Sequence, residues 1–315
     1  MKTEDSFQPS VEYHPIPEHL EATEVFRNGP RYYAARVTDG ERNYIYKSAI
    51  GAKGHLNDKD GITYTPAMQL AVEMSALMII GQHREYLSGI IPEVYRLGNK
   101  PSAWYLRQDI VGQEMGRTDT PFFFADNALD QLPPHKVADY FASLQVIGRF
   151  INPTNILLAT ERRSQTNLTA FKKALPNLSL RTGLDPDGLL SRARRARDTI
   201  AAAPAVLTHG EAYPPHIIMS RGSMAMIDWE NARLDHALAD ASKVWLRAFE
   251  NPAWQERFLG ELKRDPEFNQ ELWDDVLFLE SACLFTYVSE IDQGPKDRRL
   301  AAADYCDNLV KQLAT

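Results

Sequence analysis

The strongest constraint on the fold is a change of periodicity along the chain. Up to about residue 110, short runs rich in aromatic and β-branched residues alternate with turn residues, which is typical of antiparallel strands. From about Pro133 onward, apolar residues recur at helical spacing instead. A length of 315 residues suits two lobes better than one small core. The sequence therefore predicts an α+β fold, with a small antiparallel-sheet lobe followed by a larger, mainly helical lobe.

The predicted boundaries follow from the same pattern. We expect an N-terminal arm over 1–22, a sheet lobe over 23–110 and a helical lobe over 111–315, with a hinge near 108–112. The sheet lobe should hold strands at 24–26, 32–37, 43–49, 93–96 and 104–110. It should also hold one helix, 66–80, which begins at Thr65-Pro66. The clearest helices of the second lobe are predicted at 135–150, 189–203, 236–250 and 269–291.

Composition and charge exclude several classes of protein. The formal net charge is −7, which argues against a nucleic-acid partner. The richest apolar run, 67–80, is interrupted by polar residues, so we expect no membrane association, and the start MKTEDSFQPS lacks the apolar core of a secretory signal. With only two cysteines, Cys283 and Cys306, a disulfide framework is excluded and a cytoplasmic location is expected.

One segment of the helical half has a different character: VLTHGEAYPPHIIMSRGSMAMIDWENARLDHALAD. Its runs 216–219 and 224–228 predict a hairpin with a four-residue loop, 220–223. Pairing across that loop puts Asp228 beside His216, and the preceding loop returns Glu211 to the same end. The rim of this hairpin is therefore expected to gather Glu211, His216 and Asp228.

Two carboxylates and a third polar ligand on one rim suit phosphoryl transfer. One carboxylate orients or deprotonates an attacking hydroxyl, and the other holds a divalent cation against the phosphates. For any one of these residues alone, a capped turn with ion pairs explains the residue type better. Their joint arrangement favours the functional interpretation.

The motif HGExxxxH, followed by IDWE and LADA, resembles the HGDxxxxN…(I/V)D(W/F)E…D(L/F)A signature of the aminoglycoside phosphotransferase and choline kinase-like family. The resemblance implies a protein-kinase-like fold and transfer of the γ-phosphate of ATP, or alternatively GTP, to a hydroxyl of a small molecule. By position, Glu211 stands at the catalytic aspartate, His216 at a metal-binding asparagine and Asp228 at the principal Mg²⁺ ligand. His209 and Asp240 stand at positions that brace the catalytic loop.

Two departures from the signature bear on activity. Glu211 keeps a carboxylate but moves it by one methylene. His216 is a poor ligand for Mg²⁺ and suits softer divalent ions, so Mn²⁺ is an alternative cofactor. A catalytically impaired pseudokinase, acting as a nucleotide-binding regulatory or interaction module, is the alternative function.

The sheet lobe supplies the candidate nucleotide contacts. Lys47 ends the third strand, where the family has its phosphate-contacting lysine, although a solvated edge charge is the ordinary reading of such a lysine. Glu73 lies on the helix at the margin of the apolar stripe and is its predicted partner, with Glu85 as the competing one. The turn at Asn28 and Gly29 is the candidate nucleotide-covering turn, and an ordinary hairpin turn explains it equally well.

The segment YLRQDIVG resembles the connector between the two lobes of the family, which is expected to contact the base of the nucleotide. The resemblance implies that main-chain groups near Gln108 and Ile110 face an adenine edge. Arg107, just before them, is unusual for a purine pocket, and this leaves the choice between ATP and GTP open.

The acceptor is the least constrained part. Glu280 lies at the centre of the strongest apolar stripe of the helix 269–291, so this carboxylate needs a partner. That partner is either an arginine of the helix 189–203 or the ammonium group of a substrate, with Trp273 and Tyr287 adding cation–π attraction. The resemblance implies a hydroxylated acceptor, and an aminoglycoside, a choline-like amine, a sugar and an amino alcohol all stay open.

Overall fold

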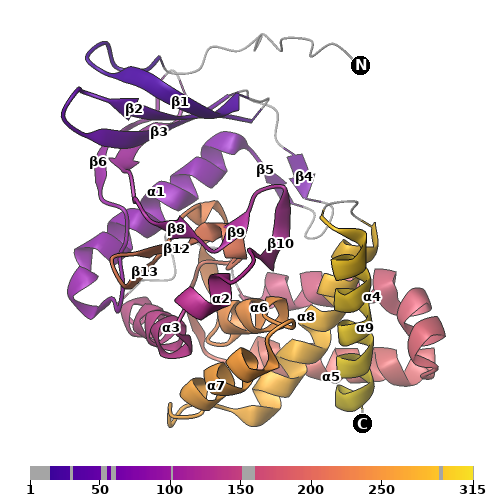
Figure 1. Cartoon of the computed structure of the whole chain (residues 1–315). Helices are drawn as coiled ribbons and strands as arrows, with labels where there is room; N and C mark the ends of the chain where they lie inside the picture. Colours follow the sequence, from indigo (N-terminus) through magenta and orange to yellow (C-terminus); the bar gives the residue numbers. More distant parts are fainter. Residues whose placement is uncertain are drawn as a thin grey trace. The chain divides into compact units, whose positions relative to one another are not determined.

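The computed structural model describes residues 15–28, 31–50, 55–57, 62–100, 102–150, 160–290 and 294–314. By their contacts, the residues group into two compact units, which Figure 1 shows as ribbons. The first unit comprises residues 1–84, 91–111 and 228–231, and the second comprises 85–90, 112–227 and 232–315. The short segment 228–231 thus belongs to the first unit although the second unit surrounds it in the sequence.

The first unit is built on a five-stranded antiparallel sheet in the order β1-β2-β3-β7-β6. The strands are β1 (Glu21–Asn28), β2 (Tyr32–Thr38), β3 (Asn43–Ala49), β6 (Val94–Gly98) and β7 (Trp104–Gln108). The predicted strands are therefore confirmed, but β1 begins three residues before the predicted 24–26 segment. The reason is that the residues of this edge strand up to Arg27 are all exposed, so they carry no alternating apolar signal.

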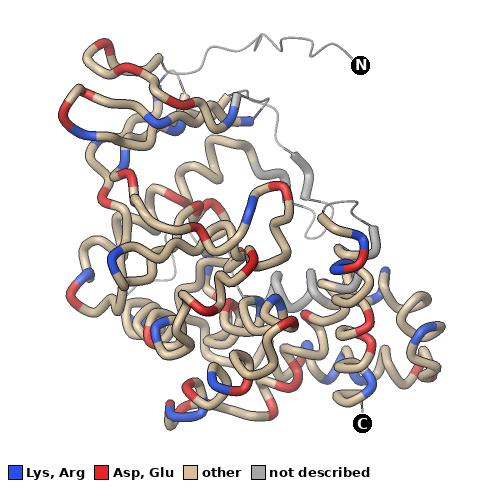
Figure 2. The backbone as a smooth tube through the Cα atoms, viewed as in Figure 1, with Lys and Arg blue, Asp and Glu red and all other residues tan. Residues whose placement is uncertain are grey.

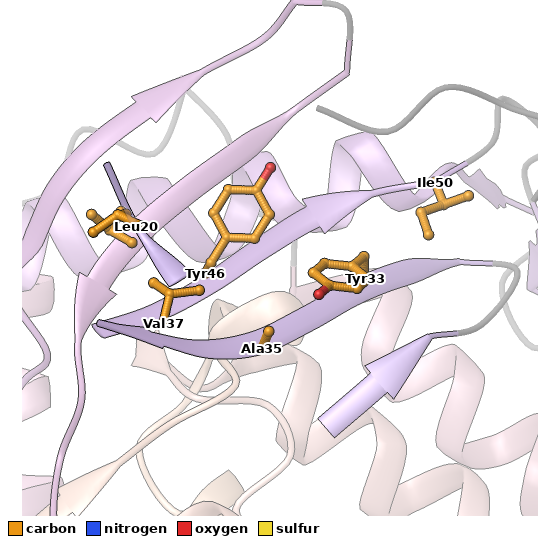
Figure 3. Packing of buried hydrophobic residues seen from close by; sticks show 7 residues of the cluster. Leu20, Tyr33, Ala35, Val37, Tyr46 and Ile50 are labelled. Carbon is orange, nitrogen blue, oxygen red and sulfur yellow. The ribbon is translucent and has the colours of Figure 1, made fainter. Parts of the chain in front are cut away.

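One face of this sheet carries a hydrophobic cluster (Figure 3). Its buried members alternate along β2 and are completed by residues from β3, β7 and neighbouring segments: Leu20, Tyr33, Ala35, Val37, Tyr46, Ile50 and Leu106. Leu20, with Ile16 packed against the cluster, comes from the segment predicted as an arm. The start of that predicted arm, residues 1–14, lies outside the described residues.

The opposite face packs against helix α1 (Pro66–Gln82). The predicted start is confirmed, because the side chain of Thr65 accepts a hydrogen bond from Met68 N at 3.1 Å and Pro66 occupies the first turn. Leu70 of α1 joins a second buried cluster on this face of the sheet, with Tyr32, Ala49, Ala103 and Tyr105. Two short strands, β4 (His55–Asn57) and β5 (Ile62–Tyr64), pair before α1.

The second unit is mainly helical. Its helices are α2 (Ala128–Gln131), α3 (Pro134–Gly148), α4 (Thr160–Thr182), α5 (Pro186–Ala202), α6 (Ala239–Arg247), α7 (Pro252–Leu262), α8 (Gln270–Glu290) and α9 (Lys296–Leu313). Helix α8 packs against α4, α5, α6 and α9, which explains why it is apolar nearly all round. The predicted helix 236–250 starts too early, because His236 ends strand β14 and pairs with Ala205.

The segment that contains the HGExxxxH and IDWE motifs is built largely of short strands and turns. Strand β11 (Ala205–Thr208) pairs with β14 (Arg233–His236), and β12 (Ile217–Ser220) lies between β13 (Ser223–Met226) and β8 (Gln113–Glu114). Strands β9 (Gly116–Arg117) and β10 (Thr120–Phe124) pair with each other. Three single turns complete the list: η1 (Arg84–Tyr86), η2 (Pro214–His216) and η3 (Trp229–Asn231), the last of which belongs to the first unit.

The hairpin β12–β13 has the predicted register but a shorter loop. Ile217 pairs with Met226, and the pairing runs on to Ser220 with Ser223. The predicted four-residue loop is therefore wrong, since only Arg221 and Gly222 remain between the strands. Both have positive φ, 50° and 79°, as a two-residue hairpin turn requires.

Charged residues are spread along the helices of the second unit. Figure 2 shows Lys and Arg interspersed with Asp and Glu on them, which agrees with solvated helix faces. Among the described helices, none is long and apolar enough to cross a membrane.

The turn at Arg221 and Gly222, between β12 and β13, can be tested with a matched control. Gly222→Ala should lower the free energy of unfolding by about 1 kcal/mol, because φ is positive there while no heavy atom lies within 4 Å of an added Cβ. Gly260→Ala, inside α7 and equally open, should instead raise it by about 0.5–1 kcal/mol. Urea denaturation of the two variants measures both effects. Equal changes of one sign would contradict the turn geometry.

Candidate active site

Lys47 is the centre of an ionic cluster in the first unit. Its Nζ lies 2.7 Å from Glu73 Oε2, 2.7 Å from Asp228 Oδ1 and 3.5 Å from Glu230 Oε2. The predicted pair with Glu73 is present, and the contact with Asp228 joins residues 181 positions apart in the chain. Lys47 Nζ also lies 4.9 Å from the centroid of the Tyr32 ring. One cation therefore holds together strand β3, helix α1 and turn η3.

Burial makes this cluster electrostatically strong. The side chain of Glu73 is 1% exposed and that of Lys47 is 12% exposed, whereas Asp228 keeps 35% of its surface. Burial alone would lower the pKa of Lys47, but the carboxylates of Asp228 and Glu73 outweigh it and raise this pKa well above its usual value. Lys47 is thus a fixed positive charge, and Asp228 is its most accessible carboxylate.

The backbone at Asp228 is left-handed, with φ of 65°. Few non-glycine residues adopt this conformation, and Asp and Asn do so more readily than others. The residue just before it is fixed within the second unit: Ile227 N donates to His216 O at 3.0 Å, and Ile227 O lies 2.8 Å from His209 Nε2. The strand ends at Met226, and the turn at Asp228 follows after Ile227.

A second set of predicted residues lies in the loop 209–216 of the second unit. Asp240 is 3% exposed and braces the start of this loop, since its Oδ2 accepts from His209 N at 2.6 Å and its Oδ1 accepts from Gly210 N at 3.0 Å. Arg233 donates to Gly210 O at 2.8 Å. The loop backbone is therefore held by one buried carboxylate and one buried guanidinium.

The two histidines of this loop have defined hydrogen bonds. His209 Nδ1 accepts from Glu211 N at 3.4 Å, so its Nε2 carries the proton that is donated to Ile227 O. His216 Nδ1 donates to Glu211 O at 2.9 Å, and its ring stacks on Tyr213 with centroids 6.0 Å apart. A metal ion at His216 would therefore have to bind through Nε2.

Asp228 is the candidate ligand for a divalent cation. In the part of the chain that the structure describes, no group of three or more His, Cys, Asp or Glu side chains is arranged to hold a metal ion alone. Mg²⁺ commonly uses one or two protein carboxylates and completes its shell with substrate phosphates and water. Asp228, a hard oxygen donor already facing a cation, fits this role.

The connector between β7 and Gly112 uses its main chain internally. Gln108 N donates to Glu93 O at 2.8 Å, and Gln108 O accepts from Arg107 Nη1 at 2.9 Å. Ile110 is 8% exposed. The backbone groups of Gln108 that were expected to meet an adenine edge thus already have partners within the first unit.

The other predicted residues are placed as follows. Trp273 is 1% exposed and packs edge-on against Trp245, so its ring is part of the core. Glu280 is 7% exposed, and its predicted partner, an arginine of α5 or a substrate ammonium group, stays a prediction. Arg192 of α5 pairs with Asp275 of α8. Three predicted contacts lie outside the described residues: Gly29 and the side chains of Asn28 and Tyr287.

Glu230 is the cluster member that the sequence analysis missed. It follows Asp228 by two residues in the IDWE motif and reaches Lys47 because Asp228 and η3 turn the chain. The only signal was the pair of acids in that motif. Its side chain is 13% exposed, so it adds a largely buried negative charge to the cluster.

Comparisons with known proteins show which fold the chain has. A model of the phosphotransferase enzyme family matches residues 151–279. An aminoglycoside 2'-phosphotransferase-IIIa mutant in a GDP complex is 16% identical with a TM-score of 0.54, over 93% of this chain and 92% of that one. LicA in complex with AMP is 14% identical with a TM-score of 0.56, over 95% and 94%. No curated protein sequence matches significantly.

The predicted family resemblance is confirmed. The chain has the kinase-like fold of these phosphotransferases. The matched range contains the loop 209–216, Asp228 and Asp240, but neither Lys47 nor Glu73. The contact between Lys47 and Asp228 is therefore an observation independent of the family match.

The lysine cluster predicts a loss of stability when its cation is removed. Lys47→Met leaves Glu73 buried without its cation and should cost about 3–5 kcal/mol at pH 8. The pKa of Lys47 is raised in the folded state by Asp228 and Glu73, so the stabilisation by its charge is present at pH 8 and is lost only as the pH rises through that raised pKa. Denaturant melts of the variant and of wild type at pH 8 measure the loss.

The matched control for this effect is the double variant Lys47→Met/Glu73→Gln. Its loss should be smaller than that of Lys47→Met, because the uncompensated carboxylate is gone. A Lys47→Met protein as stable as wild type would contradict the cluster.

The loop brace predicts a second stability effect. Asp240→Ala leaves the N–H groups of His209 and Gly210 without their buried acceptors and should cost about 2–5 kcal/mol. Asp119→Ala is the control, because Asp119 makes an ion pair with Arg117 in which both side chains are more than half exposed, and its loss of stability should be much smaller than that of Asp240→Ala. Similar melting temperatures for the two variants would show that Asp240 does not brace the loop.

Proposed function

We propose that this protein is a kinase of small molecules. It transfers the terminal phosphate of a purine nucleoside triphosphate, ATP or GTP, to a hydroxyl group of a metabolite or drug. The observation that carries the proposal is the contact of Lys47 with both Glu73 and Asp228 at 2.7 Å. A lysine held by one buried acid and facing a second, accessible acid is the arrangement that phosphoryl transfer uses.

Each residue has a distinct role in the proposed reaction. Lys47, oriented by Glu73, contacts the phosphates. Asp228 holds Mg²⁺ or Mn²⁺, which neutralises phosphate charge when it is bound. Glu211 orients the acceptor hydroxyl and takes its proton as general base. His209 and Asp240 keep the loop in shape, and no phosphoenzyme intermediate is required.

The family and fold support this function at a coarse level. The similar structures include complexes of aminoglycoside phosphotransferases and LicA with GDP, ADP and AMP, and some contain kanamycin or hygromycin B. By analogy with those proteins, we propose a hydroxylated acceptor, and a cationic one first. Both cysteines are buried free thiols, in line with action in the reducing cytoplasm.

The alternative is a nucleotide-binding module without turnover. It is favoured by Glu211 and His216, which stand where the family signature has Asp and Asn, and by the hydrogen bond that ties His216 to the loop backbone. The two functions differ in one measurable property, which is the release of nucleoside diphosphate in the presence of an acceptor.

The proposal predicts acceptor-dependent turnover that needs Glu211. The purified protein is incubated with ATP or GTP, with Mg²⁺ or Mn²⁺, and with a panel of amino alcohols, aminoglycosides and sugars. Glu211→Ala should lower kcat by about 10²–10⁴-fold, while the thermal shift caused by metal–nucleotide stays unchanged.

Two further variants complete this test. Glu211→Asp keeps a carboxylate and is expected to retain measurable turnover, and Glu256→Ala, an exposed acid of α7, should match wild type. A thermal shift with nucleotide but no diphosphate release from any acceptor would favour the pseudokinase. The absence of any thermal shift would reject both functions.

A further inference from the structure

Strand β7 presents two buried polar atoms without partners. Tyr105 is 0% exposed and Arg107 is 8% exposed, and neither the Tyr105 hydroxyl nor Arg107 Nε has a hydrogen-bond partner in the described structure. A buried polar atom without a partner is costly, so two of them on one strand need an explanation. Because they are two residues apart on a strand, both side chains project to the same face of the sheet.

That face is the one that carries Lys47. Lys47 pairs with Tyr105 across β3 and β7, and Ile45 pairs with Arg107. The row of Arg107 therefore lies about 7 Å along the strands from the row of Lys47. A ligand whose phosphates meet Lys47 and whose other end meets Arg107 has to be elongated, as a nucleotide is.

The surroundings of Arg107 are unusually polar for a purine site. Arg36 lies in the same row, opposite Ile45 on strand β2, and donates from Nε to Asp109 Oδ2 at 2.6 Å. Arg107 itself donates from Nη1 to Gln108 O at 2.9 Å. Gln108 O therefore accepts from a guanidinium, and only its second lone pair would be left for the amino group of adenine.

The chemistry of the base decides what Arg107 can bind. A guanidinium only donates hydrogen bonds. Guanine presents two acceptors, O6 and N7, on one edge, whereas adenine presents the N7 acceptor beside an N6 amino donor. A donor facing the amino group would stay unpaired, and such a buried mismatch discriminates strongly.

We propose that the nucleotide of this site carries guanine, and that Arg107 donates from Nε to O6 of the base. This inference rests on the proposed function, since it takes the Lys47 face of the sheet as the nucleotide site. It goes further by naming the phosphate donor as GTP. Discrimination by such a contact is expected to be about tenfold or more against adenine.

The test is a set of dissociation constants for the full chain with GDP, IDP and ADP in the presence of Mg²⁺, measured by calorimetry. GDP should bind at least about tenfold more tightly than ADP. IDP keeps O6 and N7 but lacks the 2-amino group, so it should bind like GDP. These three constants need no variant, and therefore stand even if a substitution at the buried Arg107 prevents folding.

Variants then assign the effect to Arg107. Arg107→Met should bring the ratio of the ADP and GDP constants close to one, chiefly by weakening GDP, while Arg96→Met, at an exposed position of β6, should leave it unchanged. ADP binding as tightly as GDP would overturn the inference but leave phosphotransfer intact. IDP binding as weakly as ADP would overturn the contact with O6. Binding of none of the three would overturn the proposed function together with the inference.

Discussion

One buried ammonium group is the interaction on which the first unit depends. Lys47 attracts three acids that come from α1 and from the segment 228–231, and burial lets its single positive charge act on all of them with little screening. Without that charge, the segment 228–231 would bring two more carboxylates toward the buried Glu73. The same lysine therefore stabilises the unit and positions the acid that is proposed to hold a metal.

The loop 209–216 is held by a different kind of constraint. Its geometry depends on backbone N–H groups that converge on one buried carboxylate, Asp240, and on a histidine whose tautomer is fixed by its two neighbours. Such a loop needs no reorganisation before it presents Glu211, which is what electrostatic preorganisation demands of a catalytic group.

The helix starts and the strand pairing were predicted well, because each depends on residue types that are close together in the sequence. The cap at Thr65 followed from the residue types Thr and Pro, and the register of β12 with β13 followed from spacing. Glu73, the partner of Lys47, followed from its place at the margin of the apolar stripe of α1. What could not be predicted depended on three-dimensional context: the edge strand β1 has no apolar alternation, the tight turn at Arg221 requires positive φ, and Glu230 reaches Lys47 only because the chain reverses.

The left-handed backbone at residue 228 limits which side chains evolution can sample there. Branched and bulky residues are strained in this conformation, while glycine, asparagine and aspartate fit it. Of these three, only aspartate brings a negative charge to Lys47. The main-chain conformation and the positive charge of Lys47 thus favour the same amino acid, so a substitution at this position would lose the fit to the backbone, the ion pair with Lys47, or both.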